Sequence, residues 1–201
     1  MLFRSLEIYE FYLKQISECD KAIEEYYKEF DKHGDGNLPN DKKQKKGKNT
    51  PKFDVRQSLY DISGIDFTKI PGLSELSVQT IISEVGLDMS KWATEKHFTS
   101  WLGLSPNNKI TGGKVFDTKT KKVKNKASAA FRIAALTLGR GKSAISGFFR
   151  RIKGKAGTPK AITATARKLA CMFYRLLKYR GFVEFYIFQL LALFSIYLLF
   201  P

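Results

Sequence analysis

Apolar residues in the first 30 positions recur at spacings that alternate between four and three. The repeating positions are Leu2, Leu6, Tyr9, Leu13, Ile16, Asp20, Ile23, Tyr27 and Phe30. A 3.5-residue repeat keeps one seam of a helix facing a partner helix, and a lone polar member such as Asp20 can fix the register. The pattern predicts a coiled-coil helix over residues 1–33 and a homo-oligomer formed through residues 2–30. The alternative is an amphipathic helix that folds onto its own domain.

The next segment, residues 34–52, is rich in lysine and reads as a basic linker. The helical spacing of apolar residues then resumes and predicts a short helix in 53–64 that ends at Gly64. Pro71 and Gly72 predict a tight turn before a second helix that ends near Gly86. The apolar face expected for this helix consists of Leu76, Ile81, Ile82 and Val85. This arrangement resembles a helix-hairpin-helix motif, in which the backbone at Gly72 would bind a phosphate; a plain helical corner is the alternative.

Four further helices complete the expected fold, which is mostly α. They are predicted at 95–104 with Thr94 as cap, at 126–138 with Lys126 and Arg132 pointing outward, at 143–153, and from Pro159 to Leu177. Residues 53–180 would form one helical domain containing a short basic loop or ribbon. The tail, 181–201, is hydrophobic, and its length fits either a membrane-spanning helix or read-through sequence after a frameshift. The second interpretation is favoured.

The charge is concentrated in one part of the chain. The net charge is +16, yet residues 107–180 hold 20 basic side chains and one acidic one, while residues 1–41 hold 5 basic and 10 acidic ones. Such a density favours a polyanionic partner, with nucleic acid the usual one, although a solvated surface is the simpler alternative. Two cysteines and two histidines exclude a disulfide scaffold and a zinc finger. Because Glu7 and Glu10 interrupt any signal peptide, a cytoplasmic, nucleoid-associated protein is expected.

The candidate chemistry lies in the loop at residues 109–114. Thr111 offers a hydroxyl, Gly112 and Gly113 allow a close approach of the backbone to phosphate, and Lys114 adds a cation. Asn108 and Val115 exclude a Walker loop. The residues alone leave open whether this loop binds phosphate or attacks it. Lys109, Lys114 and Arg132 are the candidate phosphate-binding cations.

Several stretches together resemble a known family in its own order. They are IPGLSELSVQTIISEVG, DMSKWATEKHFTSWLGLSPNNKITGGKV, NKASAAFRIAALTL and GTPKAITATARKLACMFYRLLKY. The chain is similar to the C-terminal part of the DEDD-type insertion-sequence transposases of the IS-one-ten type, related to the Piv invertases. The resemblance implies a DNA recombinase, in some members guided by a bridge RNA, with a serine nucleophile, a coiled coil, and a RuvC-like domain that carries four acidic metal ligands.

The departures from the family define the expected function. No four-acid set precedes the coiled coil, so no metal site or cofactor is assigned to this chain; the divalent metal would belong to the missing RuvC-like domain. Thr111 stands at the serine position, and its β-methyl crowds an in-line attack. Arg167 replaces a histidine common among relatives. We expect a truncated and impaired transposase that binds DNA, with Thr111 as its catalytic residue. The alternative is a non-catalytic, dimeric nucleic-acid-binding protein.

Overall fold

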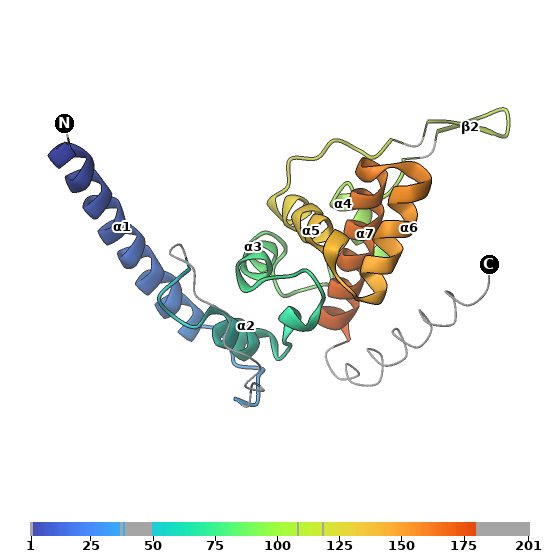
Figure 1. Cartoon of the computed structure of the whole chain (residues 1–201). Coiled ribbons are helices and arrows are strands. Elements are labelled where there is room, and N and C mark those ends of the chain that lie inside the picture. The colour runs from blue at the N-terminus through green and yellow to red at the C-terminus, as the bar shows by residue number, and fades with distance from the viewer. Residues whose placement is uncertain (1, 37, 39–49, 108, 118, 180–201) are drawn as a thin grey trace. The chain divides into compact units, whose positions relative to one another are not determined.

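The computed structural model describes residues 2–36, 38, 50–107, 109–117 and 119–179, and it confirms a mostly helical chain. For residues 2, 3, 109 and 115–117 it describes the backbone alone. The chain divides into two compact units, Met1–Asp66 and Phe67–Pro201, which are described separately (Figure 1). The predicted hydrophobic tail, 181–201, and most of the predicted basic linker, 34–52, lie outside the described residues.

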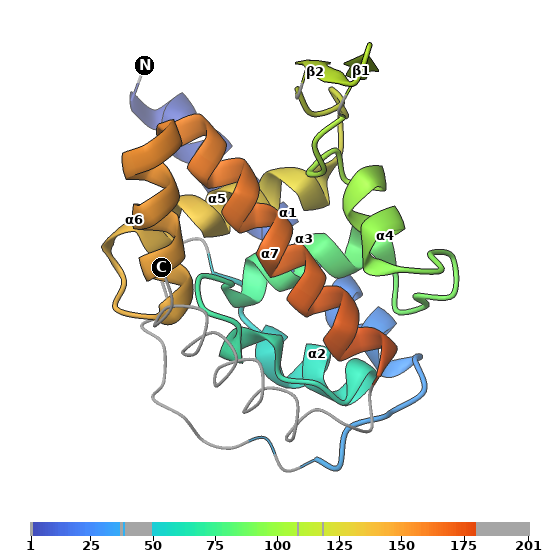
Figure 2. The same cartoon turned by 90° about the vertical axis from the view of Figure 1, so that its right-hand side faces the viewer.

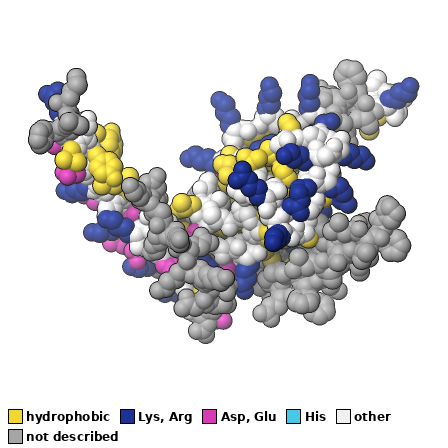
Figure 3. Space-filling view, in the orientation of Figure 1, with side chains coloured by type: hydrophobic (Ala, Val, Ile, Leu, Met, Phe, Trp, Pro, Cys, Tyr) yellow, Lys and Arg dark blue, Asp and Glu magenta, His cyan; other side chains and the backbone are white. Residues whose placement is uncertain are grey.

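The first unit contains the long helix α1 (Leu2–Lys28) and the short helix α2 (Val55–Ser63). The predicted seam of α1 is exposed over its first half, where Leu6, Tyr9, Leu13 and Ile16 keep 46–59% of their surface. Figure 3 shows hydrophobic side chains gathered on this helix. Near the other end the seam meets its own chain: the Tyr27 ring packs edge-on against Phe53 at 6.2 Å, and an Asp20 carboxylate oxygen accepts the Lys52 backbone N–H at 3.2 Å. These contacts fit a helix that folds in part onto its own unit, and the coiled coil stays a prediction.

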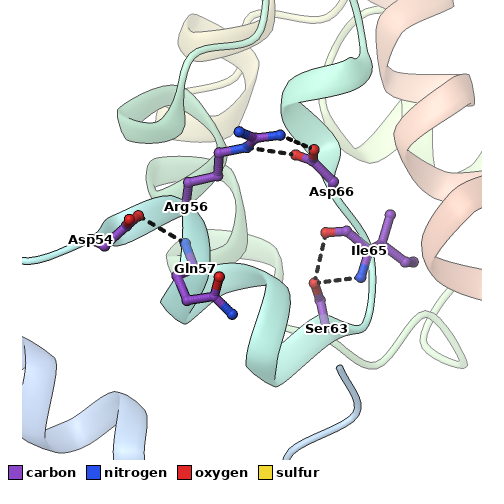
Figure 4. Close-up of polar contacts among 6 residues, drawn as sticks. All are labelled: Asp54, Arg56, Gln57, Ser63, Ile65 and Asp66. Carbon is purple, nitrogen blue, oxygen red and sulfur yellow. Dashed lines mark hydrogen bonds and ion pairs between the residues drawn. The ribbon is translucent and has the colours of Figure 1, made fainter. Parts of the chain in front are cut away.

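Polar contacts fix both ends of α2. Asp54 caps its start by accepting the Gln57 backbone N–H (Figure 4). Gly64 ends it in the left-handed conformation, as predicted. Just beyond, the Arg56 guanidinium pairs with the nearly buried Asp66 carboxylate at 2.5 Å and 3.4 Å. A paired charge is the form in which a carboxylate tolerates burial, so this contact anchors the end of the unit to α2.

The second unit is built around α7 (Thr158–Lys178), which packs against α4 (Glu95–Trp101), α5 (Lys126–Thr137) and α6 (Ala144–Ala156). Figure 2 shows α7 running across this body. Two short 3-10 helices, η1 (Phe67–Lys69) and η2 (Leu138–Arg140), complete it together with α3 (Glu75–Val85), which packs on α5. Phe173 lies at the centre, stacked on Phe67 at 4.5 Å and edge-on to Phe131 at 5.8 Å.

The helix starts and most buried faces of this unit were predicted correctly. Thr94 and Ser143 cap α4 and α6, and Pro159 lies in the first turn of α7. Two details predicted for α3 and α4 were wrong. Leu76 keeps 41% of its surface although it was assigned to the apolar face of α3; Val78 is buried there instead. The helix predicted at 95–104 ends at Trp101, because Gly103 adopts a left-handed conformation that stops it.

Candidate nucleic-acid interface

The loop with the candidate chemistry forms a two-stranded antiparallel ribbon. Strand β1 (Lys109–Thr111) pairs with β2 (Lys114–Asp117), and Thr111 lies opposite Lys114. The turn between them consists of Gly112 at φ 57° and Gly113 at φ 74°. Positive φ at both central residues is the two-residue turn that matches the twist of a hairpin, and it strongly favours glycine. An added Cβ would meet nothing within 4 Å at either position, so backbone conformation and not crowding requires these glycines.

The ribbon extends away from the helical body of its unit (Figures 1 and 2). Thr111, Gly112, Gly113 and Lys114 are all exposed, and the neighbouring Ile110 keeps 64% of its surface. The structure therefore brings the Thr111 hydroxyl, the two glycines and the Lys114 ammonium group together at one exposed tip. Lys109 begins β1, but its side chain is outside the described residues.

A pocket of about 390 Å³ lies at the base of the ribbon. An isolated bridge between Pro106 and Thr120 closes the ribbon there, and the chain then returns past the end of α4. The residues that give the pocket its character are Gly103, Lys121, Lys122, Lys124, Ser128 and Arg132. Four of these six carry a positive charge, so the pocket favours an anionic group.

The wall of this pocket requires glycine at position 103, both for its backbone conformation and for lack of space for a Cβ atom. The φ of Gly103 is +65°, and a Cβ there would lie 2.9 Å from both the Lys121 carbonyl oxygen and Val123 Cγ2. The Gly103 N–H donates to the Ser100 carbonyl, and the Leu104 N–H donates to the Thr99 carbonyl. These two bonds form the Schellman end of α4. The returning basic segment therefore packs directly on a helix end that only glycine accommodates without strain.

Arg132 faces inward more than the sequence predicted. Its guanidinium donates to Thr163 Oγ1 at 2.9 Å and to the Gly103 carbonyl at 3.3 Å, and the residue is half-buried. The expectation of an outward-pointing Arg132 was wrong, because the α5 face that carries it is turned toward α7. Arg132 nevertheless lines the pocket, so it holds α4, α5 and α7 together and places a positive charge beside Lys121 and Lys124.

Gly72 has a packing reason for being glycine. Its φ is +88°, and a Cβ would lie 2.8 Å from the Ala134 carbonyl oxygen and 3.0 Å from Leu138 Cγ. The N-cap of the following α3 is Ser74, whose hydroxyl accepts the Ser77 N–H. One of the N–H groups that could hold a phosphate at this helix start is thus already bonded. A phosphate-binding role for Gly72 stays a prediction.

The surface around the ribbon carries many basic side chains and few acidic ones. No Asp or Glu occurs in the sequence of α5, α6 or α7. Figure 3 shows lysine and arginine side chains spread over the visible face of the body. An acid from α4, Glu95, accepts the Arg175 guanidinium at 2.5 Å and 2.8 Å, which fastens α7 to α4. The remaining cations give this unit the charge that a polyanion would neutralise.

The described residues do not favour metal or thiol chemistry. Among them no group of three or more His, Cys, Asp or Glu side chains could hold a metal ion. Cys171 lies on α7, and burial raises the pKa of its thiol to about 11, which makes the thiol a poor nucleophile. In the same described part of the chain, no helix is long and apolar enough to cross a membrane.

The fold and site therefore define a basic helical domain with a glycine-tipped ribbon. Residues 66–149 match the family model described as Transposase IS116/IS110/IS902 family. This match confirms the resemblance seen in the sequence and is consistent with a C-terminal transposase domain of that family, for which DNA is the implied partner. The match covers the ribbon, the pocket and α3–α5, and it ends within α6. No curated protein and no solved structure matches the chain.

The sequence indicated the ribbon but not the pocket behind it. Lys121, Lys122 and Lys124 counted only as part of a basic run, and Gly103 was read as an ordinary residue of a longer helix. The sequence did contain a signal for the end of α4: helices often end at a glycine in the left-handed conformation, and Gly103 follows a capped apolar helix. What the sequence could not show is that the basic run returns across this helix end.

Proposed function

We propose that this chain binds DNA through the ribbon and the basic body, and that the Thr111 hydroxyl attacks a DNA phosphodiester. One observation carries the proposal: an exposed hydroxyl lies beside a two-glycine turn and opposite a lysine, at the tip of a ribbon in a transposase domain. Glycines without side chains let the backbone N–H groups approach phosphate oxygens. Lys114 would stabilise the charge that develops on those oxygens.

The reaction that fits these groups is a phosphoryl transfer. The Thr111 oxygen would form a bond to phosphorus while one bridging DNA oxygen leaves, giving a phosphothreonine linkage and a free DNA hydroxyl. The hydroxyl proton must pass to a base. In this proposal a partner component supplies the base. A further domain or chain with acidic groups, and a bridge RNA, are the partners that the family resemblance suggests.

Threonine at this position would make the reaction slow. Its β-methyl restricts χ1 and crowds the line of attack, whereas a serine oxygen rotates freely. We therefore expect Thr111→Ser to form more covalent product than the natural chain. This impairment belongs to the proposal and follows from the chemistry of the side chain.

The test is covalent capture of DNA. The full chain is incubated with DNA carrying the ends of its element, and covalent adducts are separated on a denaturing gel. The adduct should be absent in Thr111→Ala, increased in Thr111→Ser, and unchanged in Thr120→Ala, a matched control at the base of the same ribbon. An adduct that persists in Thr111→Ala would exclude Thr111 as the nucleophile.

The second candidate is a non-catalytic, dimeric nucleic-acid-binding protein. The exposed seam of α1 favours it, because four large apolar side chains in its first half remain about half exposed. In this case DNA binding would persist while no adduct forms, even in Thr111→Ser or after addition of a RuvC-like partner. Binding and adduct formation, measured on the same samples, separate the two candidates.

A further inference from the structure

The pocket at the base of the ribbon combines positive charge with an apolar wall. Within the described part of the chain its walls hold four positively charged side chains and no acidic one; the cations are Lys121, Lys122, Lys124 and Arg132. Leu102 and Val123 contribute apolar side chains to the same walls, and Val123 keeps 45% of its surface exposed. A ligand that suits this pocket therefore carries a negative charge and also an apolar surface.

Short contacts hold these groups around one space. The Arg132 guanidinium donates to the Gly103 carbonyl oxygen at 3.3 Å. Val123 approaches the same residue from the returning segment, because a Cβ on Gly103 would lie 2.9 Å from Val123 Cγ2. The bonds of Arg132 to Gly103 and to Thr163 use two of the five N–H groups of the guanidinium. Arg132 can therefore keep its place in the body and still donate to an anion.

The start of α5 adds a hydroxyl and a helix dipole to the pocket. Ser128 lines the pocket and keeps only 5% of its surface exposed. Its backbone N–H donates to the Asn125 side chain, whereas its hydroxyl has no hydrogen-bond partner among the described residues. The first turn of α5 contains no acidic residue, although the helix dipole favours a negative charge there. Because buried polar groups usually have a partner, this hydroxyl indicates a polar ligand.

We propose that this pocket holds one unpaired nucleotide of a DNA strand. The lysines and Arg132 would bind its phosphate, and its base would pack against Leu102 and Val123. The volume of about 390 Å³ lies in the range of cavities that enclose a single small ligand, whereas a base that is stacked and paired within a duplex cannot enter. The inference rests on the proposed binding of DNA and adds to it a site for a strand opened beside the ribbon.

The experiment compares the affinity of the full chain for three labelled DNA duplexes by fluorescence anisotropy. One duplex is fully paired, the second carries one extra unpaired thymine, and the third carries an abasic residue in place of that thymine. The abasic duplex keeps the additional phosphate and the flexibility of the bulge but lacks the base. The chain should bind the thymine bulge at least about fivefold more tightly than the abasic bulge, and the paired duplex most weakly.

Substitutions in the pocket should change this preference as well as the overall affinity. Val123→Glu places a carboxylate in the apolar part of the pocket and should abolish the preference for the thymine bulge. Ile133→Glu is its matched control, because Ile133 is also exposed but lies on α5 outside the pocket, and it should leave the preference unchanged. Lys124→Gln should reduce the preference of the chain for both bulges over the paired duplex. Lys142→Gln, which removes an exposed lysine outside the pocket, should keep it.

Lys114→Gln separates this inference from the proposal for the ribbon. It should weaken binding of all three duplexes and leave the preference among them unchanged. A natural chain that binds none of the duplexes would reject the proposed function together with the pocket site. Equal affinity for all three duplexes would reject the pocket site alone and leave the ribbon and the basic body as the DNA contacts.

Two other results would overturn the inference. A preference for the thymine bulge that persists unchanged in both Val123→Glu and Lys124→Gln would place the unpaired nucleotide outside the pocket. The second is binding of free thymidine monophosphate that is lost in Val123→Glu, while the natural chain shows no preference among the duplexes; this would assign the pocket to free nucleotides. Thermal melting, followed by circular dichroism, confirms for each variant that the fold is retained.

Discussion

Gly103→Ala tests whether the pocket at the base of the ribbon depends on close packing of the basic segment against the end of α4. Two costs add at this position. An alanine at φ +65° costs about 1–2 kcal/mol relative to glycine. Its Cβ would also lie 2.9 Å from the Lys121 carbonyl oxygen and from Val123 Cγ2, and moving these atoms costs about 1–2 kcal/mol more, as overpacking does elsewhere.

We therefore expect Gly103→Ala to lower the free energy of unfolding by about 2–4 kcal/mol. The assay is urea denaturation of the full chain, followed by circular dichroism, with the slope against urea compared between variants. Gly147→Ala is the matched control: Gly147 lies inside α6 without positive φ, and its Cβ would meet nothing within 4 Å. That change should be neutral or stabilise the chain by up to about 1 kcal/mol.

The same variant should also weaken DNA binding. The Gly103 carbonyl accepts the Arg132 guanidinium, so displacement of this wall moves both Arg132 and the lysines of the pocket. A loss of DNA affinity is expected even under conditions in which the variant remains folded. If Gly103→Ala unfolds within about 0.5 kcal/mol of the natural chain, the packing argument for the pocket wall is refuted.

Two further predictions concern α7 of the second unit and α1 of the first unit. Tyr174→Phe should lower the free energy of unfolding by about 1–3 kcal/mol, because the Tyr174 hydroxyl donates to the Trp92 carbonyl at 2.7 Å and accepts from Lys178 Nζ at 2.6 Å. The carbonyl would keep only its longer contact with Lys178 Nζ, at 3.4 Å; thermal or urea denaturation checks this. Leu13→Glu should convert a dimer to a monomer in sedimentation analysis if the α1 seam pairs two chains. Glu7→Gln, outside the seam, should leave the mass unchanged, and a monomeric natural chain at micromolar concentration would contradict the coiled-coil prediction.

Local signals predicted most of the elements of this fold. Ser, Thr and Asp caps mark the helix starts, Gly64 and Gly86 mark two helix ends, and the apolar faces of α5 and α7 follow the helical period. These features depend on neighbours within a few residues. The ribbon was also foreseeable, since two glycines between residues of a basic run fit a tight turn.

The errors concern contacts between elements distant in the sequence. Arg132 was expected to point outward, yet it bonds Thr163, 31 residues away. The Leu76 error, by contrast, was local: the helical period set by Ile81, Ile82 and Val85 leads back to Val78, which is the residue that is buried. The pocket at Gly103 and the approach of Lys168 to Phe148 likewise depend on how the helices pack, and neither has a local sequence signature.

The central claim is that the hydroxyl at the tip of the ribbon forms the bond to DNA, and mass spectrometry of the captured product tests it most directly. The chain, or Thr111→Ser for higher yield, is reacted with DNA carrying the ends of its element, digested with nuclease and protease, and searched for a peptide that carries a nucleotide. We predict a single modified peptide containing residues 110–114, with the nucleotide on position 111. A nucleotide on another hydroxyl, such as Ser105, or no modified peptide from Thr111→Ser while DNA is bound, would contradict the account.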